Sequence, residues 1–354
     1  MNAMATKTSS GNFFEDFAVG MRLTHATPRT LTAGDVAVYG ALYGSRFAVQ
    51  SSEPFARAIG YSAAPVDDLI VFHHVFGKTV PDVSLNAVAN LGYAECVFGV
   101  PVFVGDTVRA ESEVIGLKEN SNKRTGVVYV RSRGLNQRDE IVLDYARWVM
   151  VHKRDQDASA PAAVVPELAE AVDAATFETA ALPDALANYD VQLSGSPHRF
   201  GDYQIGEQID HVDGMTIEEA EHQSATRLYQ NTAKVHFNAL EQKQSRFGRR
   251  LVYGGVIISM ARSHSFNGLG NAFKLLAING GRHVAPSFSG DTIYAWSEVL
   301  DMQEIAAHPA IGAMRLRTVA LKDRDASQFT RFDDSGRYDP SVVLDLDYWV
   351  AIPR

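Results

Sequence analysis

One stretch of sequence occurs twice: residues 100–108 read VPVFVGDTV, and residues 285–293 read APSFSGDTI. Both copies continue alike, with AESEV at 110–114 and AWSEV at 295–299. The second copy follows the first at an offset of 185 residues. A period of that length indicates a duplicated domain rather than a solenoid repeat. Where two copies of one fold differ in sequence, the difference points to the chemistry.

The offset between the copies changes along the chain. It is 186 for residues 65–68 and 251–254, and 201 for residues 143–144 and 344–345. The second copy therefore contains about sixteen extra residues. We expect them between 302 and 339, where the sequence is rich in charged and turn-forming residues.

The chain is expected to divide into two domains joined by a linker. At 354 residues its length already suggests two domains. Residues 155–195 form a compositional break rich in alanine and proline, and we expect a linker there with a short helix beginning near Pro166. The predicted boundaries are an N-terminal domain at 1–154, the linker at 155–195 and a C-terminal domain at 196–354.

Each copy shows the same order of predicted elements: an opening strand, a capped helix, a loop, an apolar helix and several alternating strands. We expect the apolar helices at 69–76 and 256–263, and first-copy strands at 125–133 and 141–151. A helix that is apolar all round must be buried, and strands that follow one another favour an antiparallel sheet. The sequence therefore predicts an α+β fold in which a sheet wraps a central helix in each half. We expect the two sheets to join, because joining covers their edges.

The first helix of the second copy has a possible start signal. Thr216 is followed three residues later by Glu219, which is the pattern of a capping box. We therefore expect Thr216 to cap a helix over 220–230.

Composition excludes several classes of function. The net charge is −9 and no dense cluster of lysine and arginine occurs, so nucleic acid and anionic membranes are not expected as partners. The single cysteine, Cys96, excludes an internal disulfide and fits a reducing compartment. The N-terminus lacks the apolar stretch of a signal peptide, and no apolar run is long enough to span a membrane. These features predict a cytoplasmic protein.

The order of elements and the repeated Pro-x-Phe-x-Gly-Asp-Thr strand resemble the MaoC-like hot dog family, which includes the (R)-specific enoyl-CoA hydratases. Their motif, Asp-x-Asn-Pro-(Leu/Ile)-His, corresponds here to residues 231–236, which read NTAKVH. The family's Val-His-Gly turn corresponds to residues 252–254, which read VYG. Residues 228–238 and 247–250 are similar to the mesaconyl-CoA hydratases within that family. The resemblance implies a tandem double hot dog fold and an acyl-CoA substrate.

The resemblance also implies catalytic residues in the second copy. His236 takes the place of the motif histidine and is expected to act as acid and base, since imidazole titrates near working pH. Asn231 stands where the family has aspartate, and an amide cannot transfer a proton. Either His236 performs both transfers while Asn231 orients water or His236, or another carboxylate substitutes, or the activity is not hydration. The first copy has Gln50 in place of the histidine.

Three further groups are candidates for substrate contacts. Gly254 and Gly255 open the apolar helix, where free N–H groups could receive the thioester oxygen. Arg262, on the same helix, could bind a substrate carboxylate or form an internal ion pair. Arg249 and Arg250 are alternatives for the carboxylate or for the phosphates of CoA.

The resemblance favours a cofactor-free hydro-lyase that adds water to a short branched enoyl-CoA, expected to be mesaconyl-CoA. Two alternatives stay open: a hot dog acyl-CoA thioesterase, and a non-catalytic acyl-CoA-binding protein. No metal is expected, because His73 and His74 have no nearby ligands at zinc spacing. The two fused copies already supply one pair of folds, and the chain could still form a homo-oligomer, a dimer or higher.

Overall fold

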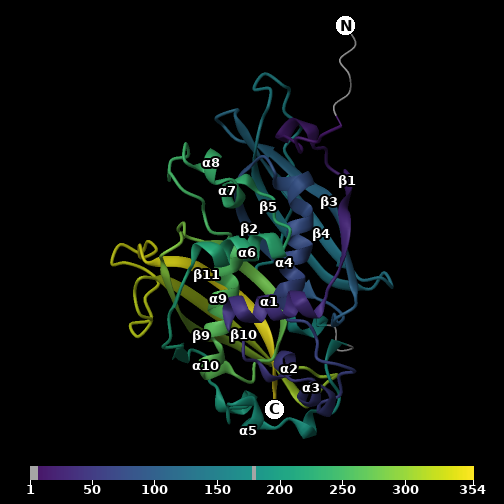
Figure 1. Ribbon diagram of the computed structural model, residues 1–354, viewed down its shortest axis with the longest axis vertical. Coiled ribbons are helices and arrows are strands. Elements are labelled where there is room, and N and C mark those ends of the chain that lie inside the picture. Colours follow the sequence, from purple (N-terminus) through teal and green to yellow (C-terminus); the bar gives the residue numbers. More distant parts are fainter. Residues whose placement is uncertain (1–6, 178–180) are drawn as a thin grey trace.

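The structure is a computed structural model that describes residues 7–177 and 181–354 (Figure 1). Its strands are β1 (Arg22–Thr30), β2 (Ala87–Phe98), β3 (Thr107–Glu119), β4 (Thr125–Leu135), β5 (Ile141–His152), β6 (Gln208–Asp210), β7 (Met215–Thr216), β8 (Lys274–His283), β9 (Thr292–Glu304), β10 (Ile311–Lys322) and β11 (Val342–Pro353). Its α-helices are α1 (Ala33–Tyr43), α2 (Ala48–Ser51), α3 (Glu53–Ala58), α4 (Asp68–Thr79), α5 (Val191–Ser194), α6 (Glu219–Leu228), α7 (Lys234–Phe237), α8 (Ala239–Gln242), α9 (Gly254–His264) and α10 (Phe266–Leu269).

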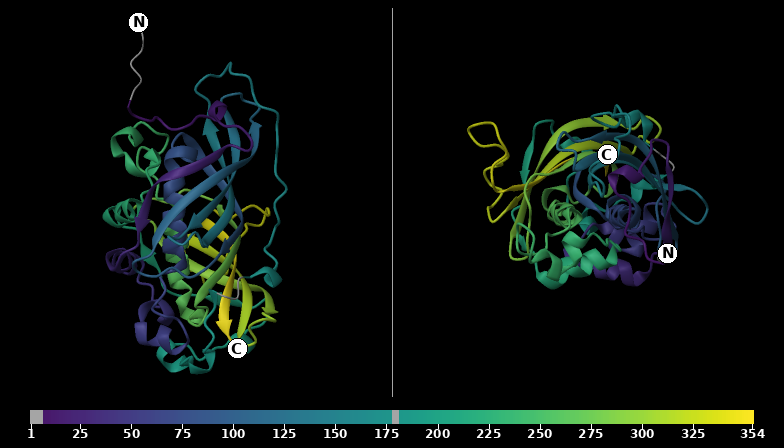
Figure 2. Two further views of the ribbon diagram at one scale, coloured as in Figure 1. Left: turned by 90° about the vertical axis from the view of Figure 1, so that its right-hand side faces the viewer. Right: turned by 90° about the horizontal axis from the view of Figure 1, so that it is seen from above.

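All strand pairings in the described ranges are antiparallel, and they form one 11-stranded sheet. The strand order is β1-β3-β4-β5-β2-β8-β11-β10-β9-β6, with β7 also paired to β9. The two halves meet at β2 and β8, where Cys96 lies opposite Ile278 and Val97 opposite Ala277. The predicted α+β class and the joined sheet are both confirmed. Seen from above, the sheet arches over the helices (Figure 2).

The central helices of the two halves are α4 and α9. Both are buried along most of their length, as their apolar sequences predict. They lie side by side under the arch, and His73 Nε2 of α4 is 2.9 Å from Ser259 Oγ of α9. A single hydrophobic core contains residues of both halves. The central part of the molecule is therefore an interface between two copies of one fold.

Matching hydrogen bonds repeat in the two copies. His25 Nε2 lies 2.7 Å from Ser112 Oγ, and His211 Nε2 lies 2.8 Å from Ser297 Oγ. These pairs are separated by 186 and 185 residues, so the offset found in the sequence is also the offset of the structures.

The expected insertion lies between β10 and β11. The connection there runs over 323–341, whereas the equivalent connection between β4 and β5 runs over 136–140. The inserted loop packs on the sheet through Ala326 and Phe329, and Trp296 Nε1 donates to Thr330 O at 3.0 Å. The location predicted from the sequence is confirmed.

The capping role expected of Thr216 is wrong. Helix α6 begins at Glu219, and its N-cap residue is Glu218. Thr216 ends β7, where its Oγ1 lies 2.8 Å from Thr292 Oγ1. Thr30 and Thr107 make the same contact in the first copy at 2.7 Å, so Thr216 corresponds to Thr30, not to the cap Thr32.

The connection over 155–195 runs along the outside of the sheet (Figure 2). Val164 forms an isolated antiparallel bridge with Leu117, and Val172 N donates to Asn279 Oδ1 at 2.8 Å. The helix expected near Pro166 is absent, because the chain there is extended against the sheet. Within the described residues, no helix combines the length and apolar character needed to cross a membrane.

Candidate active site

The start of α9 provides two free backbone donors. Tyr253 is the N-cap residue, so Gly254 and Gly255 hold the first two helical positions. Neither of their N–H groups has a hydrogen-bond acceptor within the part of the chain that the structure describes. The first turn of a helix leaves such groups unpaired and carries partial positive charge. An oxygen that gains negative charge would be stabilised at this point.

His236 lies beside the start of α9, on the short helix α7. Its Nδ1 donates to Leu251 O at 2.8 Å, and its ring centroid is 5.7 Å from that of Tyr253. A carbonyl can only accept, so Nδ1 carries the proton and Nε2 keeps a free lone pair. Burial lowers the pKa of His236 to about 4. At neutral pH His236 is therefore an uncharged base with a fixed tautomer.

The loop before α9 and helix α7 hold each other in place. Leu251 N donates to Val235 O at 3.1 Å, and Gln223 Nε2 of α6 donates to His236 O at 2.6 Å. The backbone of His236 is therefore anchored from two sides. The orientation of its ring follows from these bonds together with the contact to Leu251.

Asn231 is buried and turns the chain into α7. Only 1% of its surface is exposed. Its Oδ1 accepts from Ala233 N at 3.1 Å, and its own N–H donates to Thr226 O at 3.1 Å. Within the described ranges no hydrogen bond joins Asn231 to His236, and Asn231 Nδ2 has no partner. Its contribution to the site passes through the turn that carries His236.

A second histidine, His283, lies against Gly254 and was missed from the sequence. A Cβ atom added to Gly254 would stand 2.6 Å from His283 Nε2. This Nε2 is buried and has no partner, and burial followed by the nearby charge of His236 lowers the pKa of His283 to about 4. Comparing the copies would have found it, because Phe98 stands at the matching place, 185 residues earlier.

The three candidate arginines are not brought together. Arg262 is buried at the other end of α9, about 12 Å along the helix from Gly254 at a rise of about 1.5 Å per residue. Its guanidinium donates to Ser265 Oγ at 3.1 Å and to Ala272 O, and it stacks on Phe47 at 3.8 Å. These contacts favour an internal role for Arg262, with carbonyl and hydroxyl partners in place of the expected ion pair.

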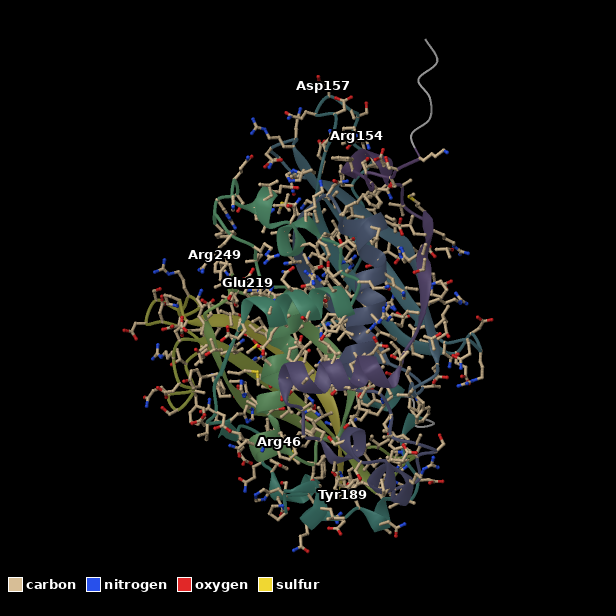
Figure 3. All side chains as sticks on the ribbon, in the orientation of Figure 1. Arg46, Arg154, Asp157, Tyr189, Glu219 and Arg249 are labelled. Carbon is tan, nitrogen blue, oxygen red and sulfur yellow. The ribbon has the colours of Figure 1, made fainter. Side chains whose placement is uncertain are left out.

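Arg250 and Arg249 lie on the segment before α9. Arg250 is paired with the Glu219 carboxylate. Arg249 is exposed at the edge of the molecule, on the same side as Glu219 (Figure 3), and lies over the Phe288 ring at 4.0 Å. Of the three arginines, Arg249 is the one with an exposed side chain and no carboxylate partner within the described residues.

The equivalent positions of the first copy serve the fold. Gln50, in place of His236, donates through Nε2 to Phe273 O at 2.8 Å. Asp67 caps α4 through Leu69 N at 2.8 Å, and burial raises its pKa to about 6. Asp68, in place of Gly254, pairs with Lys274 at 2.9 Å. The chemistry-bearing groups therefore gather in the second copy, as the sequence predicted.

The described residues contain no group of three or more His, Cys, Asp or Glu side chains that could hold a metal ion. Two small cavities, lined in part by Tyr43 and Met260 and by Arg262 and Tyr348, do not include His236 or His283 in their linings. The free atoms at the start of α9 thus define the candidate site better than any cavity does.

Known proteins resemble this chain over nearly its whole length. The family model described as mesaconyl-CoA hydratase matches residues 2–332. A β-methylmalyl-CoA dehydratase of Chloroflexus aurantiacus is 60% identical, with 99% of both chains covered. A mesaconyl-CoA hydratase of Cereibacter sphaeroides is 59% identical, covering 98% of this chain and 100% of the relative.

Solved structures agree in fold. A MaoC-domain dehydratase from Chloroflexus aurantiacus superposes with a TM-score of 0.96 at 59% identity, covering 99% of both chains. A double hot dog protein from Mycobacterium tuberculosis gives 0.77 at 25% identity, covering 98% of this chain and 99% of that one. The tandem double hot dog fold expected from the sequence is confirmed.

Proposed function

The chain belongs to the mesaconyl-CoA hydratase family, and we propose that it catalyses the reversible addition of water to mesaconyl-CoA, giving β-methylmalyl-CoA. The relatives that are about 60% identical bear the names of the two directions of this reaction. The observation that carries the proposal is His236, an uncharged base with a free Nε2 beside two unpaired helix N–H groups. Hydration of an enoyl thioester needs these two features together.

His236 is proposed to perform both proton transfers. Its Nε2 takes a proton from water while the water oxygen bonds to the β-carbon. The π electrons of the double bond move to the α-carbon and the thioester oxygen. The imidazolium then returns the proton to the α-carbon, which restores the neutral ring and balances the addition. Dehydration follows the same steps in reverse.

The negative charge that develops on the thioester oxygen is proposed to rest at the start of α9. The N–H groups of Gly254 and Gly255 are already oriented, so they need no reorganisation during the reaction. The first copy offers no equivalent site, because Asp67 and Asp68 stand at the start of α4 and would repel an enolate.

Asn231 is proposed to position His236 and the attacking water rather than to transfer a proton. Its Oδ1 holds the turn into α7, and its Nδ2 is free to donate to a water molecule. One base is then sufficient, because His236 both removes and returns the same proton.

Arg249 is proposed to contact the phosphates of CoA. Its exposed guanidinium has no protein carboxylate to displace. Arg249→Ala should raise the KM for the acyl-CoA and leave kcat largely unchanged, since a phosphate contact binds ground state and transition state alike.

The test of the proposed function follows two signals in one reaction. The purified protein is incubated with mesaconyl-CoA, and the absorbance of the conjugated enoyl thioester is recorded together with the release of free thiol. Loss of absorbance without thiol supports hydration. Thiol release would instead identify a thioesterase, and a protein that binds without either change would be an acyl-CoA-binding protein.

Partners and location follow from the same proposal. The partner is an acyl-CoA substrate, and we propose a cytoplasmic enzyme. The one cysteine, Cys96, is a buried free thiol in β2, which is compatible with a reducing compartment.

A further inference from the structure

His283 is a polar residue in an apolar position. It ends β8, and Phe98 ends β2 at the equivalent point of the first copy, where it belongs to the hydrophobic core. The replacement leaves an imidazole whose Nε2 is buried and makes no hydrogen bond. An unpaired buried polar atom destabilises a protein by roughly 1–3 kcal/mol. A group with that cost needs an explanation outside the fold.

The ring of His283 is held close to the start of α9. A Cβ on Gly254 would lie 2.6 Å from Nε2 and 2.7 Å from Nδ1 of that ring, so only glycine allows this approach. The free N–H of Gly254 is thus next to the unpaired nitrogen of His283. The two groups can reach a single oxygen atom.

We propose that His283 is a catalytic residue whose Nε2–H donates a hydrogen bond to the thioester oxygen of the substrate, together with Gly254 N–H. The proposal rests on the hydration reaction proposed above and names a further part of its machinery. No proton is transferred to the oxygen: His283 keeps its proton throughout, and the α-carbon receives the one that His236 took from water. The His283 contact strengthens as the oxygen gains charge.

The electrostatics of the site support a neutral donor. Burial and the charge of His236 hold the pKa of His283 at about 4, so the ring is uncharged at neutral pH. Neither ring nitrogen is fixed by a hydrogen bond in the described ranges, so the proton is free to reside on Nε2. A neutral imidazole polarises a carbonyl without being drawn into proton exchange, as in triosephosphate isomerase.

Recognition of the substrate's free carboxylate is the competing role for His283. A carboxylate binds best to a cation with several donors. His283 is uncharged in the free protein, and the buried cation of the same helix, Arg262, is at its opposite end. The thioester oxygen is therefore the better partner, and the experiment below separates the two roles.

The first measurement compares rates for three proteins: the wild type, His283→Phe and His283→Gln. Phenylalanine is the residue of the first copy and fits the same space without a donor, whereas the glutamine amide can place an N–H near Nε2. We expect His283→Phe to lower kcat by about 10²–10³-fold, as for loss of one oxyanion donor. The loss should be equal for mesaconyl-CoA and crotonyl-CoA, and His283→Gln should recover at least about tenfold of it.

The second measurement does not depend on turnover. In a His236→Ala background, bound mesaconyl-CoA stays unhydrated, and polarisation of its carbonyl shifts the enoyl thioester absorbance to longer wavelength. Adding His283→Phe should remove most of this shift while binding persists. A shift that survives would overturn the proposal, as would near wild-type rates in His283→Phe or a loss confined to mesaconyl-CoA. A wild type that binds but never hydrates mesaconyl-CoA would instead refute the proposed function, while the shift would still report on His283.

Discussion

At the scale of single residues, the site depends on one hydrogen bond. The contact from His236 Nδ1 to Leu251 O decides which ring nitrogen is the base. Without it the neutral ring could carry its proton on either nitrogen, and a share of the molecules would present a donor to the attacking water. The backbone bond thus selects the reactive tautomer before substrate arrives.

Replacing His236 with alanine should abolish most of the turnover. A positioned proton-transfer group contributes about 10²–10⁴-fold, so kcat should fall by that factor. The protein should stay folded, because His236 is only partly buried. Rates with mesaconyl-CoA and circular dichroism check both statements. Gln50→Ala, at the equivalent position of the first copy, is the control and should cost far less rate.

The activity should persist to unusually low pH. Burial holds the pKa of His236 at about 4, below the ordinary value near 6.5, and the base works only when neutral. The value of kcat/KM should therefore be flat from pH 7 to about 5 and fall as the pH drops through about 4. Crotonyl-CoA is the substrate of choice, since it has no carboxyl group of its own to titrate. A half-maximum near pH 6.5 would contradict the assignment.

Asn231→Asp should change specificity more than stability. An aspartate oxygen can still accept from Ala233 N, so the turn into α7 is kept. The second oxygen adds an anion where the amide Nδ2 stood, and it would repel the free carboxylate of mesaconyl-CoA. We expect the ratio of kcat/KM values to shift from mesaconyl-CoA toward crotonyl-CoA. An unchanged ratio would mean that residue 231 does not face the acyl group.

The sequence located part of this site for a clear reason. His236 belongs to a motif of fixed spacing, so its register against the family identified it. His283 lies on a strand that the motif does not include, and only the contact with Gly254 gives it a meaning. Arg262 was a candidate because a buried arginine needs a partner. Its partners, Ser265 and Ala272, come from the turn after the helix, which no spacing rule predicts.

At the scale of elements, the two glycines of α9 have different neighbours. Gly254 faces His283, whereas a Cβ on Gly255 would stand 2.5 Å from Cε1 of His73, which comes from α4. The first glycine therefore admits a ring of the site, and the second admits the central helix of the other half.

Alanine at each glycine should separate these two roles. Gly254→Ala should displace His283 and lower kcat by tenfold or more, with the melting temperature kept, because alanine favours a helix. Gly255→Ala should destabilise the fold by about 1–3 kcal/mol through overpacking against His73. Thermal melts and rates with mesaconyl-CoA check the pair. Equal effects of the two variants on both quantities would show that the start of α9 is a single structural contact.

Element types were predictable because their patterns are long, and element ends were less so. The central helices at 69–76 and 256–263 were found inside α4 and α9, which extend further at both ends. The capping box at Thr216 failed because the same residue types also suit a strand end. Its Oγ1 bonds across the sheet to Thr292, and the Glu219 carboxylate is taken by Arg250. Tertiary partners decided both side chains.

At the scale of the whole molecule, the two copies depend on each other. We propose the division into 1–154, 155–195 and 196–354 as a description of descent from a duplication rather than of independent folding. Tyr43 and Tyr229, at equivalent positions 186 residues apart, join their hydroxyls at 3.0 Å across the interface. The hydrophobic core around them is continuous through both halves. One copy has kept the reactive groups, and the other supplies the surface on which they are built.

The full chain should therefore unfold in a single transition, despite its two repeated halves. Circular dichroism and tryptophan fluorescence should give coincident curves, since Trp148 lies in the first half and Trp296 and Trp349 in the second. Asp68→Ala tests the coupling, because it leaves the buried ammonium of Lys274 in the other half without its 2.9 Å partner. Removing one partner of a buried pair destabilises by about 3–5 kcal/mol. We expect the whole transition to move to lower temperature. A transition that splits, with one half melting alone, would show that the shared core does not bind the copies into one folding unit.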